Sequence, residues 1–313
     1  MPSTTAALAV IGAPTSAGAY APGQEDAPRA LRDARLLERL EEAGLTVVDR
    51  GDVPRCRWRP DRERPLAQNV EAVVAGARAV AERVTEARRA GEVALVRGGD
   101  CTVGVGTVAG VVAAGDDVAV VYLDLHPDLN TPDSVRDGAL DWMGVAHLLD
   151  EDGAVAELAG LGPRRPLLEP ARVVLCGHDP AHETEHEREA LARLGIGGPT
   201  VEHVAEDPSG AARRVLALAA GAAPSRIVHF DVDLVDFVDQ PLSENLGRND
   251  GVSLDAAMEA FEVLVTGPEL VGITVTELNP HHGAEDGSTV ALFARRLAEA
   301  LGRARGGPPT GRA

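Results

Sequence analysis

Two short stretches of the sequence place carboxylates and a histidine at every second residue. Asp124, His126 and Asp128 stand in AspLeuHisProAspLeuAsn, and Asp231 and Asp233 stand in HisPheAspValAspLeuValAsp. In an extended chain this spacing puts the side chains of each stretch on one face. Converging carboxylates repel one another and are costly to bury unpaired, whereas a bound cation removes that cost. Carboxylates with one imidazole suit Mn²⁺ and its neighbours, and about five such ligands fit two ions roughly 3.5–4 Å apart.

Each acidic stretch follows a short apolar run that is typical of a buried strand. One acidic residue after a strand usually indicates a helix cap or a solvated turn, but the two stretches together favour a ligand set. A third stretch, GlyGlyAspCys at 98–101, follows another such run and opens a helix. Parallel strands end at one edge of a sheet, where open α/β proteins bind their ligands. The predicted strands are Ala7–Ile11, Leu45–Val48, Val93–Val96, Val118–Leu123, Arg172–Cys176, Arg226–Phe230, Val271–Thr276 and a weaker one near Thr200–His203.

Between these runs lie longer amphipathic stretches rich in Ala, Leu, Arg and Glu. The predicted helices are about Pro28–Ala43, Leu66–Ala90, Thr102–Ala114, Ala211–Ala220, Leu254–Leu264 and Asp286–Leu301. Continuous apolar strands that alternate with helices predict an α/β fold with a parallel sheet covered on both faces. No long polar linker divides the chain, so we expect a single domain over residues 1–302 and a disordered tail over residues 303–313.

The charge and the residue types exclude several classes of protein. The 313 residues carry a formal net charge of −19, which argues against nucleic acid or an anionic membrane as a partner. All 30 basic residues are Arg, so the chain can form neither a lysine Schiff base nor a Walker-type phosphate loop. The 3 Cys are widely spaced, and no apolar run approaches the roughly 20 residues of a membrane span. We therefore expect a cytoplasmic protein without disulfides.

Four motifs resemble those of the arginase/agmatinase (ureohydrolase) family. They are GlyGlyAspCysThr at 98–102, AspLeuHisProAsp at 124–128, PheAspValAsp at 230–233 and GluLeuAsnPro at 277–280, in the family's order and with compatible spacing. The resemblance implies a three-layer α-β-α fold around a parallel sheet of about eight strands. It also implies a dinuclear Mn²⁺ centre, hydrolysis of a guanidino or amidino group, and a homo-oligomer, either a trimer or a hexamer.

The resemblance assigns metal ligands residue by residue to the two acidic stretches. Asp124 and Asp231 would each contact both ions. Asp128 would complete the coordination of one ion, and His126 and Asp233 would bind the other. A hydroxide shared by the two ions would then attack the guanidino carbon of a small guanidino substrate.

The resemblance also suggests residues that bind the substrate. Glu277 would pair with the guanidinium group, a planar cation suited to a carboxylate. Asn130 corresponds to a residue of the arginase branch that helps to bind an α-carboxylate, although a turn-capping Asn would stand in the same place. Acidic residues that bind the α-amino group are expected within residues 177–187. The candidates are Asp179, Glu183 and Glu185, and a solvated acidic helix start explains the same charges.

Cys101 departs from the family pattern, which has a His ligand of the first metal at this position. A thiolate is softer than imidazole, so it would weaken Mn²⁺ binding there and favour Zn²⁺ or Fe²⁺. A Cys at this position is similar to the branch that hydrolyses N-hydroxyarginine. The alternative is that Cys101 is a small apolar residue in a site for one metal.

A second departure concerns Asp137 and Asp141, which stand where the arginase branch has a substrate-binding Ser and a proton-shuttling His. Asp141 can shuttle protons only if burial or acidic neighbours raise its pKa toward neutrality. Otherwise the shuttle is lost or passes to another histidine. The candidates are His147, His229, His281 and His282. His229 precedes Asp231 by two residues on the same strand face, so it is also expected to contact a ligand residue.

Together these features predict a metal-dependent amidinohydrolase that acts on arginine or N-hydroxyarginine and releases urea or hydroxyurea. Asp128 or Asp141 would pass a proton to the leaving amine. One alternative is hydrolysis of another guanidino compound, as in agmatinases and guanidinobutyrases. The other is a catalytically impaired relative with a structural or regulatory role, because the usual His is absent at both 101 and 141. Retention of bound metal distinguishes an enzyme from such a relative.

Overall fold

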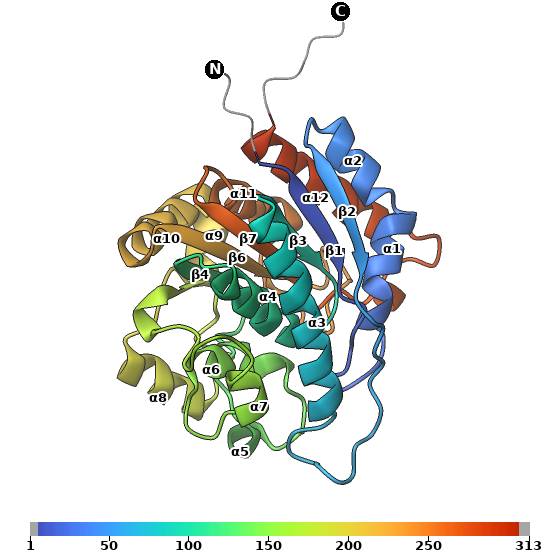
Figure 1. The fold of residues 1–313 in the computed structure, drawn as a ribbon. Coiled ribbons are helices and arrows are strands. Elements are labelled where there is room, and N and C mark those ends of the chain that lie inside the picture. Colours follow the sequence, from blue (N-terminus) through green and yellow to red (C-terminus); the bar gives the residue numbers. More distant parts are fainter. Residues whose placement is uncertain (1–5, 307–313) are drawn as a thin grey trace, which may run out of the picture.

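The computed structural model describes residues 6–306, whose strands form a single parallel sheet (Figure 1). The order across the sheet is β2-β1-β3-β7-β6-β4-β5. The strands are β1 (Leu8–Gly12), β2 (Val47–Asp52), β3 (Val93–Arg97), β4 (Val118–Leu123), β5 (Val173–Cys176), β6 (Ser225–Asp231) and β7 (Leu270–Thr276). The last two strands of the chain therefore lie in the middle of the sheet, between β3 and β4.

Helices connect the strands. They are α1 (Ala27–Asp33), α2 (Leu36–Glu42), α3 (Val70–Arg89), α4 (Thr102–Ala113), α5 (Pro132–Val135), α6 (Gly144–Leu149), α7 (Ala156–Ala159), α8 (Glu185–Leu194), α9 (Val201–Glu206), α10 (Pro208–Ala222), α11 (Leu254–Leu264) and α12 (Ser288–Arg305). Short 3-10 helices are η1 (Gln24–Asp26), η2 (Asp141–Met143), η3 (Pro170–Arg172), η4 (Val232–Leu234) and η5 (Pro280–His282).

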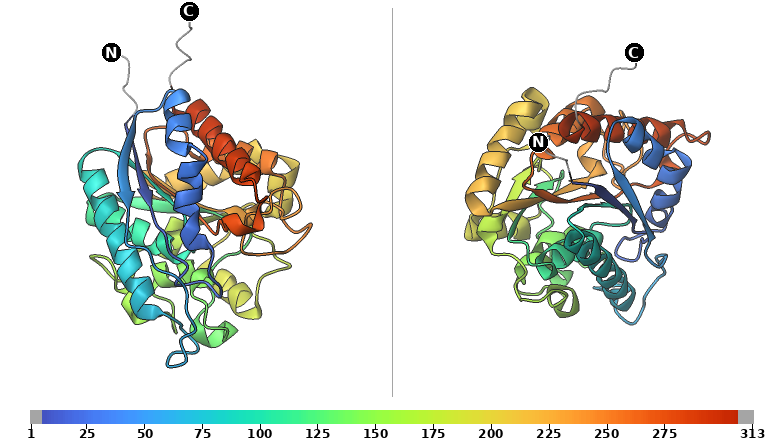
Figure 2. Two further views of the ribbon diagram at one scale, coloured as in Figure 1. Left: turned by 90° about the vertical axis from the view of Figure 1, so that its right-hand side faces the viewer. Right: turned by 45° about the horizontal axis from the view of Figure 1, so that its top comes forward.

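Successive residues along each strand point to opposite faces of the sheet, so both faces are apolar. Val10, Leu95 and Val121 pack with α1, α2 and α9 to α12. Val96 and Val120 pack on the other face with α3, α4 and α6. Figure 2 (left) shows β1 and β2 between α3 on one side and α1, α2 and α12 on the other. These three layers confirm the predicted α-β-α fold.

The seven principal predicted strands are present, with β2 shifted from the expected Leu45–Val48 to Val47–Asp52, but the weak one at Thr200–His203 is wrong. Val201 begins α9, and Thr200 stands at its N-cap, where its N–H donates to His203 Nδ1 at 3.2 Å. Val201 and Val204 are both buried, which fits the i,i+3 spacing of a helix face. Within residues 6–306 the sheet therefore has seven strands instead of about eight.

Two predicted boundaries also change. The expected helix Pro28–Ala43 is interrupted at Arg35, whose φ of 59° lies in the left-handed region, and so becomes α1 and α2. Helix α12 continues to the buried Arg305, so residues 303–305 of the expected tail are helical. Residues 307–313 of that tail lie outside the described residues.

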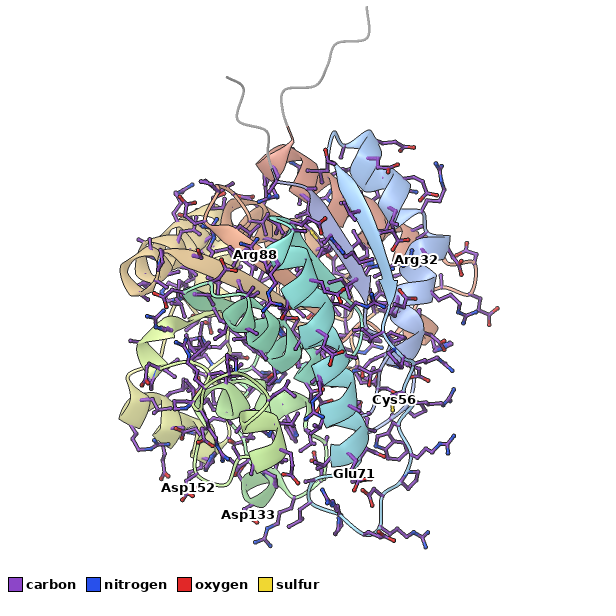
Figure 3. All side chains as sticks on the ribbon, in the orientation of Figure 1. Arg32, Cys56, Glu71, Arg88, Asp133 and Asp152 are labelled. Carbon is purple, nitrogen blue, oxygen red and sulfur yellow. The ribbon has the colours of Figure 1, made fainter. Side chains whose placement is uncertain are left out.

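Charged side chains protect the edge strand β2. Arg32 of α1, labelled in Figure 3, lies beside this strand. It pairs with Asp49 at 2.7 Å and with Asp52 at 3.1 Å. Charges on an edge strand discourage pairing with the edge of another sheet. Among residues 6–306, no helix is both long enough and apolar enough to cross a membrane.

Candidate active site

A cavity of about 620 Å³ opens at the carboxyl ends of β4 and β6, beside the start of α4 and the turn after β7. Carboxylates dominate its lining, and no arginine is among the described residues that line it. The lining residues are Tyr20, Cys101, His126, Asp128, Asp137, Ala139, Asp141, Trp142, His182, Glu187, Asp231, Asp233, Glu244, Asn245, Leu246, Gly247, Asp250 and Glu277. A cavity with this charge suits a cationic ligand.

One group of possible metal ligands follows β4 and β6. His126 Nδ1 lies 2.9 Å from Asp233 Oδ2 and 3.7 Å from Asp124 Oδ1. The His126 N–H also donates to Asp124 Oδ1 at 2.6 Å, which folds the chain back directly after β4. One ligand atom from each of the three residues lies within 4.8 Å of the others, close enough to share one ion.

A second group forms where α4 begins beside β6 and β7. The Cys101 thiol donates to Asp231 Oδ2 at 3.0 Å, and the Cys101 N–H donates to Glu277 Oε1 at 2.7 Å. These three side chains also bring one ligand atom each within 4.8 Å. Gly99 makes this approach possible, because a Cβ there would lie 2.8 Å from the Ala13 carbonyl oxygen and its φ of 87° strains other residues.

Asp128 is held at the cavity by a strained turn and by Tyr122. Its φ of 51° lies in the left-handed region, which is uncommon for a residue other than glycine and typical of functional sites. The Tyr122 hydroxyl donates to Asp128 Oδ2 at 2.5 Å. The Tyr122 ring stacks on His229 of β6, with centroids 4.2 Å apart.

The electrostatics of these residues fit bound divalent cations. Burial and the charge of Asp231 raise the pKa of Asp124 well above its usual range, and burial and Asp233 do the same for Asp231. Against the effect of burial, Asp233 raises the pKa of His126 to about 10. Asp124 Oδ2 and Asp233 Oδ1 are buried without a hydrogen-bond partner among the described residues. Raised pKa values of this kind arise when buried carboxylates repel one another, and a bound cation would oppose that shift.

This arrangement predicts how the chelated protein responds to pH. His126 has a pKa of about 10 when folded and about 6.5 when unfolded, so its stabilisation is complete below the lower value and is lost as the pH rises through the higher one. In EDTA, the free energy of unfolding should fall by on the order of 2–3 kcal/mol between pH ~7 and pH ~10. Urea denaturation followed by circular dichroism measures this change.

Two controls accompany that titration. His126→Asn should remove most of the slope, because asparagine does not titrate. Saturating divalent metal should weaken or reverse the slope, since binding requires deprotonated ligands. Equal stability of the chelated protein from pH ~7 to pH ~10 would contradict the proposed ion pair of His126 and Asp233.

Of the residues proposed to act on the substrate, Glu277, Asp141 and Asp137 line the same cavity. Gln24 Nε2 donates to Glu277 Oε2, so the carboxylate is held at both oxygens. Asp141 is half-buried and lines the cavity, and burial together with Asp100 and Asp128 raises its pKa well above the usual range. Asp137 is exposed at the same cavity. The pKa of Asp141 is therefore shifted in the direction that a proton shuttle requires.

Asn130 and Asp179 do not line the cavity. Asn130 is buried, and its amide oxygen accepts hydrogen bonds from Ser134 at 3.0 Å and Thr184 at 2.9 Å, which is the role of a turn-capping side chain. Asp179 accepts a hydrogen bond from the Ala181 N–H and lies 2.7 Å from His182 Nδ1. It reaches the cavity only through His182.

Glu187, which lines the cavity, was not among the sequence candidates. Its Oε2 accepts hydrogen bonds from the N–H and hydroxyl of Thr184, while the Glu187 N–H donates to the Thr184 hydroxyl at 3.1 Å. This capping box, Thr-x-x-Glu at the start of α8, is visible in the sequence and could have identified Glu187. The residues after η4 that line the cavity, Glu244, Asn245 and Asp250, have no comparable signal.

The alternative histidines lie elsewhere. His147 is buried in α6, and burial lowers its pKa to about 4. His281 is exposed and lies 2.9 Å from Asp26 Oδ2, and His282 Nδ1 lies 2.8 Å from the Ser243 carbonyl oxygen. None of these three lines the cavity. His229 is buried behind Cys101, and burial lowers its pKa to about 3, so its ring is neutral.

Comparisons with known proteins show which proteins this chain resembles. The model of the family described as "Arginase family" matches residues 6–302. Arginase of Bacillus subtilis is 29% identical over 295 residues, which cover 93% of this chain and 97% of that one. Human arginase-1 is 32% identical over 190 residues, which are 60% of this chain and 58% of the human one. The structure of arginase from Bacillus caldovelox superposes with a TM-score of 0.84 at 24% identity and covers 97% of this chain and 100% of that one.

Proposed function

Because the chain belongs to the arginase family, we propose that it is a divalent-metal-dependent hydrolase that cleaves a C–N bond of a guanidino compound. The first proposed substrates are arginine and N-hydroxyarginine, which would release urea and hydroxyurea. The observation that supports this proposal best is the convergence of two groups of possible metal ligands, one of which includes Glu277, at one acidic cavity. A protein with only a structural role has no physical need to keep mutually repelling, buried carboxylates.

We propose that the cluster holds two divalent cations. Asp124, His126 and Asp233 offer oxygen and nitrogen atoms that suit Mn²⁺. The group of ligands that contains Cys101 offers a sulfur atom and therefore suits a softer ion such as Zn²⁺ or Fe²⁺. When bound, two such ions would lower the pKa of a shared water enough to supply a nucleophile near neutral pH.

The chain's own residues would orient the substrate and move its proton. Glu277, held by Gln24 and by the Cys101 N–H, would pair with the guanidinium and present its carbon to the cluster. Asp141, whose pKa is raised by burial, would donate a proton to the leaving nitrogen. Half-buried Trp142 next to it would limit the access of bulk water.

The cavity favours a substrate whose tail carries a second positive charge. Asp137, Glu187 and Asp250 line it. The α-amino group of arginine fits such a lining. Agmatine, whose tail ends in an amine and has no carboxylate, fits it as well and represents the alternative substrate class.

A panel of guanidino compounds tests the proposal. Arginine, N-hydroxyarginine, agmatine and 4-guanidinobutyrate are each incubated with protein loaded with Mn²⁺, Fe²⁺, Zn²⁺ or Co²⁺, and released urea or hydroxyurea is measured. We expect turnover of at least one cationic-tailed compound and the least turnover of 4-guanidinobutyrate, whose carboxylate meets an acidic lining. Asp124→Asn is the inactive control. Metal-loaded protein that hydrolyses no compound of the panel would overturn the proposed activity.

A further inference from the structure

A buried sulfur and a buried imidazole face each other at the inner wall of the cavity. Cys101 Sγ, at the start of α4, lies 3.2 Å from His229 Nε2, in the middle of β6. Thr276 Oγ1 of β7 lies 3.2 Å from the sulfur and 3.2 Å from the same ring nitrogen. Cys101 and His229 are 2% and 1% exposed, so bulk water does not separate them.

The surroundings of His229 fix the direction of its ring. On one face the ring stacks on Tyr122, with an interplanar angle of 5°. On α4, Gly104 leaves room for the ring, because a Cβ there would lie 2.8 Å from His229 Nδ1. Gly104 follows Cys101 by one helical turn, so the same helix supplies the sulfur and the space for the imidazole.

The pair also borders a carboxylate that lacks a partner. Cys101, Asp124 and His229 each bring one ligand atom within 4.8 Å of the other two. Asp124 Oδ2 is buried and has no hydrogen-bond partner among residues 6–306. Sulfur, nitrogen and oxygen donors thus converge on one point from α4, β6 and the end of β4.

We propose that His229 is a metal ligand, which together with Cys101 replaces the imidazole that the arginase pattern places at position 101. A cation at the ordinary distances of about 2.3 Å from sulfur and 2.0–2.1 Å from nitrogen can reach both atoms across their 3.2 Å separation. The pair supplies one neutral and one anionic donor. The inference rests on the metal centre of the proposed function but not on its substrate.

This ligand set changes which metal ion would bind most tightly at Cys101 and His229. A thiolate with an imidazole and carboxylates suits Zn²⁺, Co²⁺ or Fe²⁺ better than Mn²⁺. The chain would therefore hold two chemically different ions. The softer one would lie at Cys101 and His229, and the harder one at His126 and Asp233.

Cobalt binding tests the proposal without any substrate. Metal-free protein is titrated with Co²⁺, and the thiolate-to-cobalt absorption band and the imidazole scattering in X-ray absorption are recorded. We expect two bound imidazoles per chain, from His126 and His229, in the wild-type protein. His229→Asn should remove one of these imidazoles and weaken the binding of one of the two Co²⁺ ions by at least about tenfold. Cys101→Ser should abolish the absorption band.

Matched variants control for damage to the core. His147→Asn replaces another buried histidine, and Cys176→Ser replaces another buried thiol. Both should leave the cobalt spectrum and the imidazole count unchanged. If His229→Asn does not fold, the count in the wild-type protein still decides between one imidazole and two.

The outcomes separate this inference from the proposed function. One imidazole per chain in protein that binds two Co²⁺ ions overturns the role of His229 and leaves the hydrolase proposal intact. Failure of the wild-type protein to bind any divalent ion overturns both proposals.

Discussion

Replacing Glu277 by glutamine is expected to lower kcat/KM for the guanidino substrate by at least about 100-fold, or ~3 kcal/mol. The glutamine keeps the shape of the side chain and can still accept the Cys101 N–H, but it no longer neutralises a buried guanidinium. Burial and the charge of Asp141 raise the pKa of Glu277 well above its usual range in the ligand-free protein, so the amide should cost little stability. Steady-state urea release and thermal unfolding measure the two effects.

Glu244→Gln is the matched control for this substitution. Glu244 lines the same cavity, but its carboxylate accepts a hydrogen bond from Asn279 Nδ2 at 2.7 Å and does not contact Cys101. Its change should lower kcat/KM by less than about tenfold. Equal losses in the two variants would show that Glu277 contributes only general negative charge to the cavity.

Asp231→Asn is expected to lower activity by at least about 1000-fold. Its effect on stability should have opposite signs with and without metal. The Asp231 carboxylate accepts hydrogen bonds from the Asp233 N–H at 2.7 Å and from the Cys101 thiol at 3.0 Å. Because burial and Asp233 raise its pKa, a neutral amide resembles the protonated form of the chelated protein. In EDTA the variant should unfold at the same temperature as the wild type or higher. With metal it should unfold lower, because ligand binding no longer stabilises it.

Asp100→Asn serves as the control for Asp231→Asn. Asp100 is also buried, and burial raises its pKa, but it lies behind the cavity and accepts the Gly18 N–H at 3.0 Å. It should retain the wild-type metal content by elemental analysis. If Asp231→Asn also retains two ions per chain, the proposed coordination is wrong.

The parts of the fold that depend on local pattern could be predicted from sequence. Continuous apolar runs such as Val118–Leu123 are too short for most helices and rich in β-branched residues, which favours a strand, and their ends placed the acidic stretches at one edge of the sheet. The strand prediction at Thr200–His203 was wrong because a short β-branched run fits a strand and a helix start equally well. The packing of Val201 and Val204 in the apolar core favours the helix.

Side chains that depend on contacts between distant segments were harder to predict. Asn130 belongs to a matching motif, yet Thr184, which is far away in sequence, occupies its amide oxygen. Glu187 lies at the cavity because α8 begins at Glu185, a boundary that no apolar run marked. The contact of His229 with Cys101 depends on the register of β6 beside β4 and β7, which only the assembled sheet defines.

With the proposed metal centre, the central position of β6 and β7 would tie metal acquisition to completion of the polypeptide. A nascent chain that ends before Ser225 contains β1, β2 and β3 as one group and β4 and β5 as another, with the two strands that join them still missing. Such a chain has Asp124 and Cys101 but lacks Asp231, Asp233 and Glu277. Ribosome-bound fragments should therefore bind divalent ions only weakly, and loading should follow release of the full-length product.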